Sequence, residues 1–443
     1  MKSSSLLDKK GGKIIRWITK NFQEMIDEFT LDSDAIKDVA ASFRYDIEHG
    51  VKETGESSLR MLPSYIGLPT GRETGEYLAL DFGGTNLRVV LIRLDGEGKF
   101  EVIKKVAKPL VVPGEYDFIC ADANADELFD FIADMVEEAV DGNRDKKYLL
   151  GHTFSFPSSQ TNIYNARLII WTKEFATKGV EGEVVNDLLK AALARKNLTN
   201  VEPTAVINDT VAVLLAAAYK LGNVNIGSIY ATGHNTCYYE TFTGMGKPAM
   251  VINMESGGFN KLAINKYDYK LDMESEKPYE QRLEKMVSGR YMGELLSYCL
   301  DDAWNIGKVE FTSIDISTIL ADNSDNLDGV CDLLKAKINA DITTDDAIWV
   351  KALAETIASR SARLVVATYC GIMWHLYPNG GIPKQFVAVD GSVYEKMPTI
   401  KDNMQKAIYE ILGEEADKLE LVLENGGSAL GAALAAAMEP VEC

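Results

Sequence analysis

The chain has 443 residues and carries a formal net charge of −20 at pH 7. Its length predicts two or three structural units. The negative charge argues against a nucleic-acid partner, because a phosphate backbone carries charge of the same sign. The apolar stretch at residues 364–374, which contains neither a charged residue nor His, is shorter than the roughly 20 residues that a membrane-spanning helix needs, so no transmembrane segment is expected.

The six cysteines and four histidines lie far apart, without the short spacings of a disulfide framework or a zinc site. Because no signal-peptide core with a small-residue cleavage site is present either, we expect a reducing, cytoplasmic location. The first 20 residues have a net charge of +5 and apolar side chains at helical spacing. They predict a first helix packed on the body of the protein, with a helix on a membrane surface as the alternative.

Residues 78–95 predict a strand that ends at Asp81, a turn through Gly83 and Gly84, and a second strand that follows at once. Glycine lets backbone N–H groups approach an oxyanion, Thr85 and Asn86 add donors, and Asp81 can hold Mg²⁺ through water. The pattern predicts a phosphate-binding hairpin. It differs from a Walker loop, which needs GxxxxGK[ST], and from a dinucleotide fingerprint, which opens a helix. An ordinary β-hairpin is the alternative for this segment alone.

Residues 226–242 repeat this pattern, with Thr232 and Gly233 at the turn and Asn235 soon after it. Two phosphate hairpins in one chain indicate two related α/β lobes that face one nucleotide. This is the organisation of the sugar-kinase, actin and Hsp70 group of folds. We therefore expect an α/β fold of two unequal ribonuclease-H-like lobes with a hinge cleft between them.

The order of the predicted elements suggests where the lobes begin and end. We predict a small lobe at 72–206, to which residues 428–443 return, and a large lobe formed by 1–71 and 207–427. The last predicted helix consists of small residues, which favour either close helix packing or close approach to a ligand. The predicted strands are 77–80, 87–94, 101–107, 148–155, 204–207 and 387–389, and the predicted helices are 125–140, 185–196, 211–219, 280–300, 347–376 and 431–438.

Asp209 is the candidate catalytic base. It follows a short buried strand and precedes a helix, and active sites of α/β sheets lie at the carboxyl ends of strands. Phosphoryl transfer to an alcohol uses such a carboxylate to accept the proton of the hydroxyl group. For Asp209 alone a helix N-cap is the simpler interpretation. Polar side chains at other predicted strand ends and loop edges outweigh it, because together they offer the hydrogen bonds that a hexose needs.

Nine passages resemble the hexokinase family in its single-unit eukaryotic form, in the family's order and from about residue 60 to the C-terminus. They are LALDFGGTNLRVV (78–90), HTFSFPSSQ (152–160), LIIWTKEF (168–175), VINDTVAVLLAAAY (206–219), IGSIYATGHNTCYYE (226–240), MVINMESGGF (250–259), QRLEKMVSGRYMGE (281–294), VAVDGSVYEKMP (387–398) and ENGGSALGAALAAA (424–437). The resemblance implies ATP-dependent phosphorylation of a hexose, above all D-glucose, at its 6-hydroxyl, which is the first step of glycolysis. It also implies Mg²⁺ as a cofactor, and we expect a monomer or homodimer.

The same resemblance implies a role for each matching residue. Asp209 would be the base, with Lys173 and Arg88 as further catalytic residues, and Arg88 would help with the charge on the transferred phosphoryl group. The hexose would bind to Ser155, Phe156, Pro157, Thr172, Lys173, Asn208, Asp209, Asn235, Glu255, Gln281 and Glu284. ATP would bind to Asp81, Gly83, Gly84, Thr85, Asn86, Thr232, Gly233, Asp390, Gly391, Ser392, Gly427 and Ser428, with Asp81 holding the metal through water.

Four residues depart from the family's pattern. Glu174 and Ala231 stand where glycine is usual, His234 stands where threonine or valine is common, and Ser256 stands where tryptophan is frequent. We expect them to affect sugar selectivity or nucleotide affinity, and His234 to add a positive charge below pH about 6.5. A hexokinase-like sugar sensor and an actin- or Hsp70-like ATPase are the alternatives to a sugar kinase.

Overall fold

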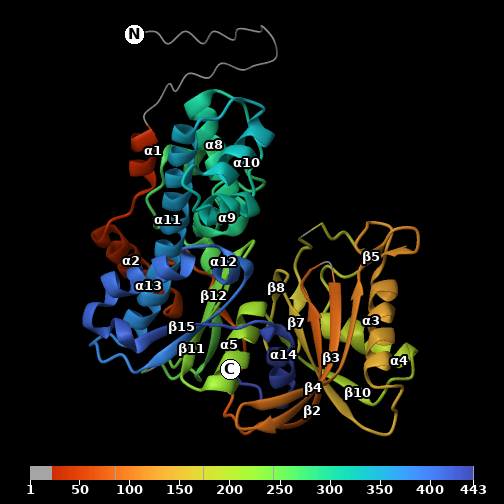
Figure 1. Ribbon diagram of the computed structural model, residues 1–443. Helices are drawn as coiled ribbons and strands as arrows, with labels where there is room; N and C mark the ends of the chain where they lie inside the picture. Colours follow the sequence, from red (N-terminus) through yellow and green to blue (C-terminus); the bar gives the residue numbers. More distant parts are fainter. Residues whose placement is uncertain (1–21, 85, 173, 243, 443) are drawn as a thin grey trace.

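The computed structural model of the protein describes residues 22–84, 86–172, 174–242 and 244–442. Two lobes lie side by side, each built on one β-sheet (Figure 1). The sheet of the smaller lobe has the strand order β10 (Val201–Ile207), β7 (Tyr148–Phe154), β2 (Thr74–Phe82), β3 (Asn86–Gly96), β4 (Lys99–Pro109). The sheet of the larger lobe has the order β1 (Leu62–Pro63), β13 (Met250–Asn253), β12 (His234–Glu240), β11 (Val224–Tyr230), β14 (Gln385–Asp390), β15 (Leu419–Leu423).

The two sheets share one topology. In each, three consecutive strands form an antiparallel meander, β2–β3–β4 in one and β11–β12–β13 in the other. Two parallel strands then extend the sheet from the first strand of the meander, β7 and β10 in one and β14 and β15 in the other. This repeat confirms the predicted pair of ribonuclease-H-like lobes. It also puts the two predicted phosphate hairpins, β2–β3 and β11–β12, at equivalent positions in the two sheets.

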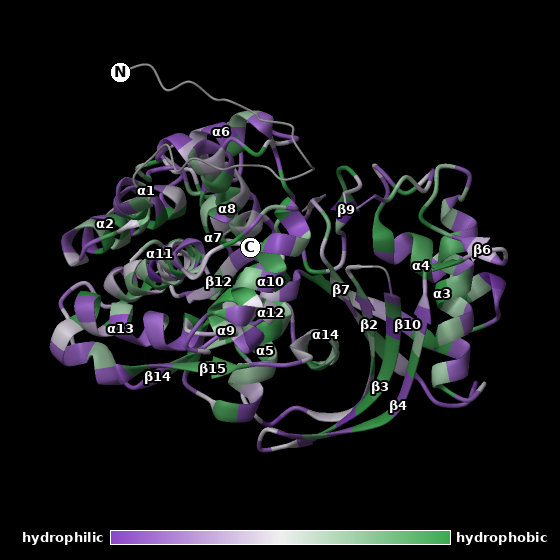
Figure 2. Cartoon of the chain, turned by 45° about the horizontal axis from the view of Figure 1, so that its top comes forward, coloured by the Kyte–Doolittle hydropathy of each residue, from purple (hydrophilic) through white to green (hydrophobic). Residues whose placement is uncertain are grey.

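Two apolar helices, α5 (Asp209–Leu221) and α14 (Gly427–Ala437), fill the space between the sheets (Figure 2). α5 packs on β11 and β12, α14 packs on β2 and β7, and the two helices pack on each other. A Cβ on Gly431 would lie 2.3 Å from the carbonyl oxygen of Ala212 on α5, and one on Gly151 of β7 would lie 1.8 Å from that of Ala432. No real contact is that short, so close packing accounts for the small residues of α14.

Further helices cover the outer faces of the sheets. α3 (Ala125–Ala139) and α4 (Val185–Arg195) cover the outer face of the small lobe's sheet, and α11 (Thr344–Leu376) packs along α2 and α13 in the large lobe. α11 begins with a capping box between Thr343 and Asp346, which fixes its first turn. The other large-lobe helices are α1 (Phe22–Phe29), α2 (Ser33–Val51), α6 (Lys266–Glu274), α7 (Arg282–Val287), α8 (Gly289–Trp304), α9 (Ser313–Ala321), α10 (Asp328–Ile338), α12 (Ser392–Lys396) and α13 (Ile400–Leu412).

The prediction of one continuous helix at 280–300 is wrong. The segment predicted as a single helix at 280–300 is broken into α7 and α8 by Ser288, whose backbone is extended at φ −77° and ψ 155°. The break frees the first N–H groups of α8 from intrahelical acceptors. They donate instead to a neighbouring turn: the N–H of Gly289 donates to Ala231 O at 2.8 Å, and that of Arg290 donates to Thr232 O at 3.2 Å.

Short elements complete the fold: β5 (Val111–Val112), β6 (Tyr116–Asp117), β8 (Ser158–Ser159), β9 (Arg167–Leu168) and the 3₁₀ turns Ser256–Gly258 and Gly413–Lys418. None of the helices in the described part of the chain is long and apolar enough to cross a membrane. The basic segment at residues 1–20, and the helix predicted for it, lie outside the described residues. The lobe boundaries at 72, 206 and 428 stay predictions.

Candidate active site

Asp209 is the first residue of α5 and follows β10 by two positions. The N-cap of α5 is its neighbour Asn208, whose Oδ1 accepts hydrogen bonds from the main-chain N–H of Thr210 at 2.9 Å and from its hydroxyl group at 2.6 Å. The N-cap interpretation therefore applies to Asn208. Its Oδ1 is committed to the helix, so only its amide nitrogen is left to donate to a ligand.

The charge of Asp209 acts on two predicted site residues. It acts on Glu255, whose pKa is raised mainly by burial and further by the carboxylates of Asp209 and Glu284. It also acts on Asp390 at the end of β14, whose pKa is raised to about 6 by burial and by the carboxylates of Glu424 and Asp209. A single carboxylate is thus within electrostatic range of both a predicted hexose residue and a predicted nucleotide residue.

The predicted hexose residues Asn235 and Glu255 form a hydrogen-bonded cluster with Asn253. The amide of Asn235 donates to Asn253 Oδ1 at 2.9 Å, and that of Asn253 donates to Glu255 Oε1 at 2.7 Å. Asn235 Oδ1 in turn accepts from the main-chain N–H of Ser256 at 3.1 Å. In the sequence Asn253 is one of the polar residues at strand ends that suit a hexose, but the resemblance assigns it no binding role of its own. The cluster presents amide and carboxylate groups in fixed orientation, which suits recognition of a polyhydroxylated ligand.

Strained backbone also marks this cluster. Glu255 and Gln281 have left-handed conformations, with φ of 51° and 55°, which cost about 1 kcal/mol or more in a residue other than glycine. Glu284 on α7 accepts a hydrogen bond from the main-chain N–H of His234 at 3.0 Å. A Cβ on Gly257 would lie 2.6 Å from Gln281 Oε1. Gln281, Glu284 and the 255–257 turn are thereby brought together.

The turn at Ala231, Thr232 and Gly233 joins β11 to β12. Its carbonyl groups are occupied, since Ala231 O and Thr232 O accept from α8 and Gly233 O accepts from the N–H of Ala231 at 3.0 Å. Among the described residues the N–H groups of Thr232 and Gly233 have no such partner, and Thr232 is exposed. The turn therefore has main-chain N–H donors to offer, as a phosphate group requires.

The first hairpin carries an ion pair. Arg88 Nη1 lies 2.8 Å from Asp81 Oδ2, and the two residues are register partners across β2 and β3. A Cβ on Gly83 would lie 3.0 Å from Ser155 Oγ, so this hairpin touches the segment predicted to bind the hexose. Gly84 is half-buried beside it, Asn86 begins β3 with an exposed side chain, and Thr85 lies outside the described residues.

Phe156 is a hexose residue by prediction, but the structure shows its side chain in an aromatic core. Its ring packs against those of Phe82, Trp171 and Phe175 and is 5% exposed. It therefore supports the loop that carries the neighbouring Ser155 and Thr172, which are half-buried, and Pro157, which is exposed. Lys173 lies outside the described residues, and Glu174, in a glycine position of the family, has a φ of 68°.

The remaining predicted nucleotide residues lie at two chain turns. Gly391 has a φ of 132°, and a Cβ there would lie 2.4 Å from Tyr230 O, so only glycine fits; Ser392 follows it as the exposed first residue of α12. Gly427 begins α14, and the carbonyl oxygen of Ser428 accepts from Thr153 Oγ1 at 3.0 Å.

The expectation that His234 becomes positively charged near pH 6.5 is wrong. The ring is 3% exposed, and burial lowers its pKa to about 4, although Nδ1 lies 3.1 Å from Ile229 O. His234 is therefore neutral at physiological pH and acts as a buried ring under the turn. Ser256, which stands where tryptophan is frequent in the family, is also fully buried.

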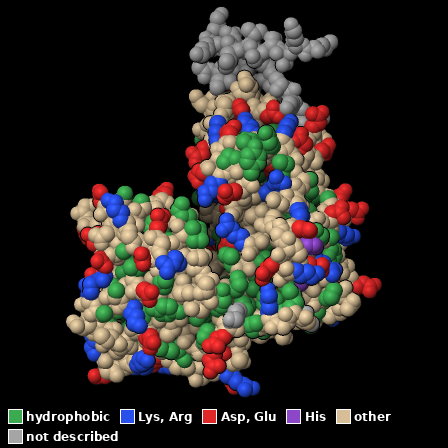
Figure 3. Space-filling view, turned by 180° about the vertical axis from the view of Figure 1, so that it is seen from behind, with side chains coloured by type: hydrophobic (Ala, Val, Ile, Leu, Met, Phe, Trp, Pro, Cys, Tyr) green, Lys and Arg blue, Asp and Glu red, His purple; other side chains and the backbone are tan. Residues whose placement is uncertain are grey.

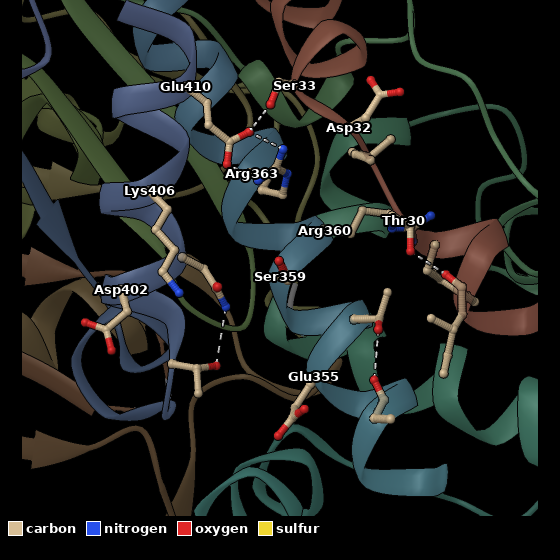
Figure 4. A pocket seen from close by; sticks show the side chains of 17 residues that line it. Thr30, Asp32, Ser33, Glu355, Ser359, Arg360, Arg363, Asp402, Lys406 and Glu410 are labelled. Atoms are coloured by element: carbon tan, nitrogen blue, oxygen red, sulfur yellow. Dashed lines mark hydrogen bonds and ion pairs between the residues drawn. The ribbon is translucent and has the colours of Figure 1, made fainter. Parts of the chain in front are cut away.

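A cavity lies away from these groups. It has a volume of about 720 Å³ and lies between the α1–α2 junction, α11 and α13 (Figure 4). Its two arginines are already paired, Arg360 with Asp268 and Arg363 with Glu410, each through two hydrogen bonds. A space-filling view from behind shows a hollow between the lobes (Figure 3).

Comparisons with known proteins agree with this arrangement. Two family models, both described as hexokinase, match residues 21–219 and 225–438. Hexokinase-1 of Schizosaccharomyces pombe is 34% identical over 96% of this chain and 92% of its own, and hexokinase-7 of Oryza sativa subsp. japonica is 35% identical over 90% and 92%. A crystal structure of a hexokinase matches with a TM-score of 0.85 at 30% identity, covering 94% of this chain and 98% of its own.

A second solved structure, the hexokinase of Schistosoma mansoni complexed with glucose, has a TM-score of 0.78 at 30% identity and covers 94% of this chain and 98% of its own. The matches extend over both lobes and over both phosphate hairpins. The repeated sheet topology, the placement of Asp209 and these similarities together show that the chain belongs to the hexokinase family, the enzymes that phosphorylate hexoses with ATP.

Proposed function

We propose that the protein transfers the γ-phosphoryl group of ATP to the 6-hydroxyl of D-glucose, giving glucose 6-phosphate and ADP. The observation that carries this proposal is that the charge of Asp209, at the start of α5, acts both on Glu255 of the Asn235–Asn253–Glu255 cluster and on Asp390. A base there can reach a hydroxyl group of a sugar held by the cluster and face a nucleotide held beside Asp390. Membership in the hexokinase family supports the same reaction.

The sugar side of the site would bind the hexose and orient it. Asn235 lies on β12, Glu255 follows β13, and Gln281 and Glu284 come from the start of α7. The hydrogen bond from Asn235 to Glu255, the one from the N–H of His234 to Glu284, and the left-handed backbone of Glu255 and Gln281 fix these groups before a ligand arrives. The amide groups of Asn208 and Asn235 would donate to the ring hydroxyl groups, and the carboxylates of Glu255 and Glu284 would accept from them. Thr172 and Lys173 would contribute from the small lobe.

The nucleotide side holds the phosphates. The N–H groups of Thr232 and Gly233 would donate to phosphate oxygens from one lobe, and the β2–β3 hairpin with Gly83, Thr85 and Asn86 would do so from the other. Mg²⁺ spreads the charge of the phosphates when it is bound. Asp81 would hold it through water: a single carboxylate suits an ion that keeps several of its waters. Arg88, released from Asp81, would then be free to neutralise charge on the transferred group.

Asp209 would accept the proton of the 6-hydroxyl late in the transfer. Water competes with the sugar as nucleophile, so the lobes must close over the sugar before the base and the phosphate align. We propose that the closing units are the small lobe at 72–206 with 428–443 and the large lobe at 1–71 and 207–427. The five described cysteines are unpaired, which supports a reducing, cytoplasmic location, and we propose a monomer or homodimer.

One coupled assay separates this proposal from its alternatives. ADP release is measured with ATP and Mg²⁺, in the presence and absence of glucose. A sugar kinase releases ADP in proportion to the glucose consumed, a sugar sensor binds glucose without releasing ADP, and an actin- or Hsp70-like ATPase releases ADP without sugar. Either of the last two outcomes would contradict the proposed function.

A further inference from the structure

We propose that the amino end of α8 positions the phosphate-binding turn Ala231–Gly233, and that Gly289 and the N–H of Arg290 are the groups on which this depends. The inference rests on the proposed function, because it takes this turn as a phosphate site. It concerns residues to which no role in binding the sugar or the nucleotide is assigned above.

The first observation is the pair of hydrogen bonds between α8 and the turn. The N–H of Gly289 donates to Ala231 O at 2.8 Å, and the N–H of Arg290 donates to Thr232 O at 3.2 Å. Both donors belong to the first turn of a helix, where an N–H has no acceptor within the helix. They hold the carbonyl groups of the turn on the side of α8. The N–H groups of Thr232 and Gly233, which the phosphate needs, are therefore left for a ligand.

The second observation is that two glycines enclose the turn. A Cβ on Gly289 would lie 3.0 Å from Ala231 O and 2.9 Å from Val393 Cγ2 of α12. A Cβ on Gly391 would lie 2.4 Å from Tyr230 O and 2.8 Å from the methyl group of Ala231. Ala231, where the family usually has glycine, therefore fits its methyl group against the bare backbone of Gly391. The turn has little room to move unless α8 moves with it.

The third observation is electrostatic. α8 runs from Gly289 to Trp304, and its backbone dipoles place partial positive charge at its amino end, directly behind the turn. The break at Ser288 is what directs that end at the turn rather than into a continuous helix with α7. A phosphate group on the outer side of the turn would be favoured by this charge.

The experiment compares two substitutions at one position. Arg290→Pro removes the N–H that bonds Thr232 O, in the first helical turn where proline is tolerated, whereas Arg290→Ala keeps the N–H and removes only the exposed side chain with its ion pair to Glu276. We expect Arg290→Pro to raise the KM for ATP by about tenfold and to leave the KM for glucose unchanged. Arg290→Ala should match the wild type in both.

A second pair tests the space around the turn. Gly289→Ala should displace Ala231 by a few tenths of an ångström and raise the KM for ATP. Gly371→Ala is the control, since its Cβ would meet Ala40 O at 2.7 Å, a similar crowding in the helix pair α11–α2. It should lower thermal stability and leave both KM values unchanged. If Gly289→Ala does not fold, the Arg290 pair decides.

The outcomes are distinct. A wild type that forms no ADP with glucose would contradict the proposed function and this inference with it. A fully active wild type whose Arg290→Pro and Gly289→Ala variants keep the KM for ATP would overturn only the inference. The inference would also be overturned if the KM values for ATP and glucose rose together in these variants, because that would indicate a general loss of structure. A selective rise in the KM for ATP supports the inference.

Discussion

The main-chain N–H of His234 donates to Glu284 Oε2 at 3.0 Å, so a predicted hexose residue holds the strand that leaves the predicted phosphate turn. Within the described part of the chain, the hydrogen bonds of the Glu255 carboxylate come from Asn235 and Asn253. The two carboxylates therefore differ in their contacts. Glu255 bonds within the proposed sugar cluster, and Glu284 bonds to the strand that leaves the proposed phosphate turn.

This difference predicts different kinetics for two similar variants. Glu255→Ala should raise the KM for glucose, because sugar hydroxyl groups are left unpaired at about 1 to 3 kcal/mol, and should leave the KM for ATP almost unchanged. Glu284→Ala should raise both. Asn235→Ala should behave as Glu255→Ala does. Steady-state kinetics with each substrate varied in turn checks this, and a rise in the KM for ATP alone would show that the sugar and nucleotide residues are assigned wrongly.

Asp209→Ala should lower kcat by about 10²- to 10⁴-fold, the usual cost of losing a general base. Asp209→Asn keeps the shape of the side chain and the hydrogen bond from the N–H of Thr210, and its kcat should fall by as much. Because Asn208 is the N-cap, both variants should unfold at the same denaturant concentration as the wild type. Near-normal kcat in a folded Asp209→Asn variant would remove Asp209 from the mechanism.

Asp390 predicts a pH dependence of stability. Its pKa of about 6 in the folded chain, against an ordinary 3.8, means that its contribution to stability is full below pH about 4 and is lost as the pH rises through 6. Asp390→Asn mimics the protonated form, so at pH 8 its free energy of unfolding should exceed that of the wild type. We expect a difference of only about 1 kcal/mol, because partial exposure to solvent screens the charge. Denaturant unfolding at pH 4 and 8 checks this, with Asp402→Asn as an exposed control. A pH-independent difference would contradict it.

Asp46 on α2 is expected to position residues 255–261, the segment that begins with the predicted hexose residue Glu255. Its carboxylate is fully buried, accepts from Ser58 Oγ at 2.5 Å and pairs with Lys261, while Ser58 Oγ accepts from the N–H of Asn260. Asp46→Asn should cost about 1 to 3 kcal/mol of stability and raise the KM for glucose more than that for ATP. An unchanged KM for glucose at a temperature where the variant is folded would limit Asp46 to a structural role.

Much of the fold could be predicted because local signals agreed with one another. The two hairpins, α3, α5 and α11 combine strong periodicity with glycine turns or capping residues, and α14 stands out by its small residues. The relation between the two lobes could not be predicted from either hairpin alone. The same turn chemistry occurs twice in the chain, and this recurrence predicts the repeated lobes.

Other features depend on tertiary contacts that a sequence does not display. The apolar periodicity of 280–300 continues through Ser288, and only the carbonyl groups of Ala231 and Thr232 explain the break. The charge expected on His234 failed because burial, not chain position, sets its pKa. Phe156 stands beside a polar residue in the sequence but packs against Trp171 and Phe175. α6 and α9 are absent from the predicted helices, although Asn265 and Thr312 are capping residues that signal where these helices begin.

Closure of the lobes predicts a response to a shortened sugar. Xylose lacks the 6-hydroxymethyl group but keeps the ring hydroxyl groups that Asn208, Asn235, Glu255 and Glu284 would bind. Water should then enter beside Asp209 and attack ATP, so ATP hydrolysis should be slow without sugar, rise with xylose, and lose that rise in Asp209→Ala. Hydrolysis that is equally fast without any sugar would favour an ATPase that does not depend on closure.

The central claim is that Asp209 activates the 6-hydroxyl of a sugar held by the Asn235–Glu255 cluster. The most direct measurement follows the phosphoryl group by ³¹P NMR after incubation of the enzyme with ATP, Mg²⁺ and either glucose or 6-deoxyglucose. The account predicts glucose 6-phosphate and ADP in equal amounts from glucose, no sugar phosphate from 6-deoxyglucose, and formation of both products about 10²- to 10⁴-fold more slowly in Asp209→Asn. A phosphate ester at any other hydroxyl group, or on 6-deoxyglucose, would contradict it.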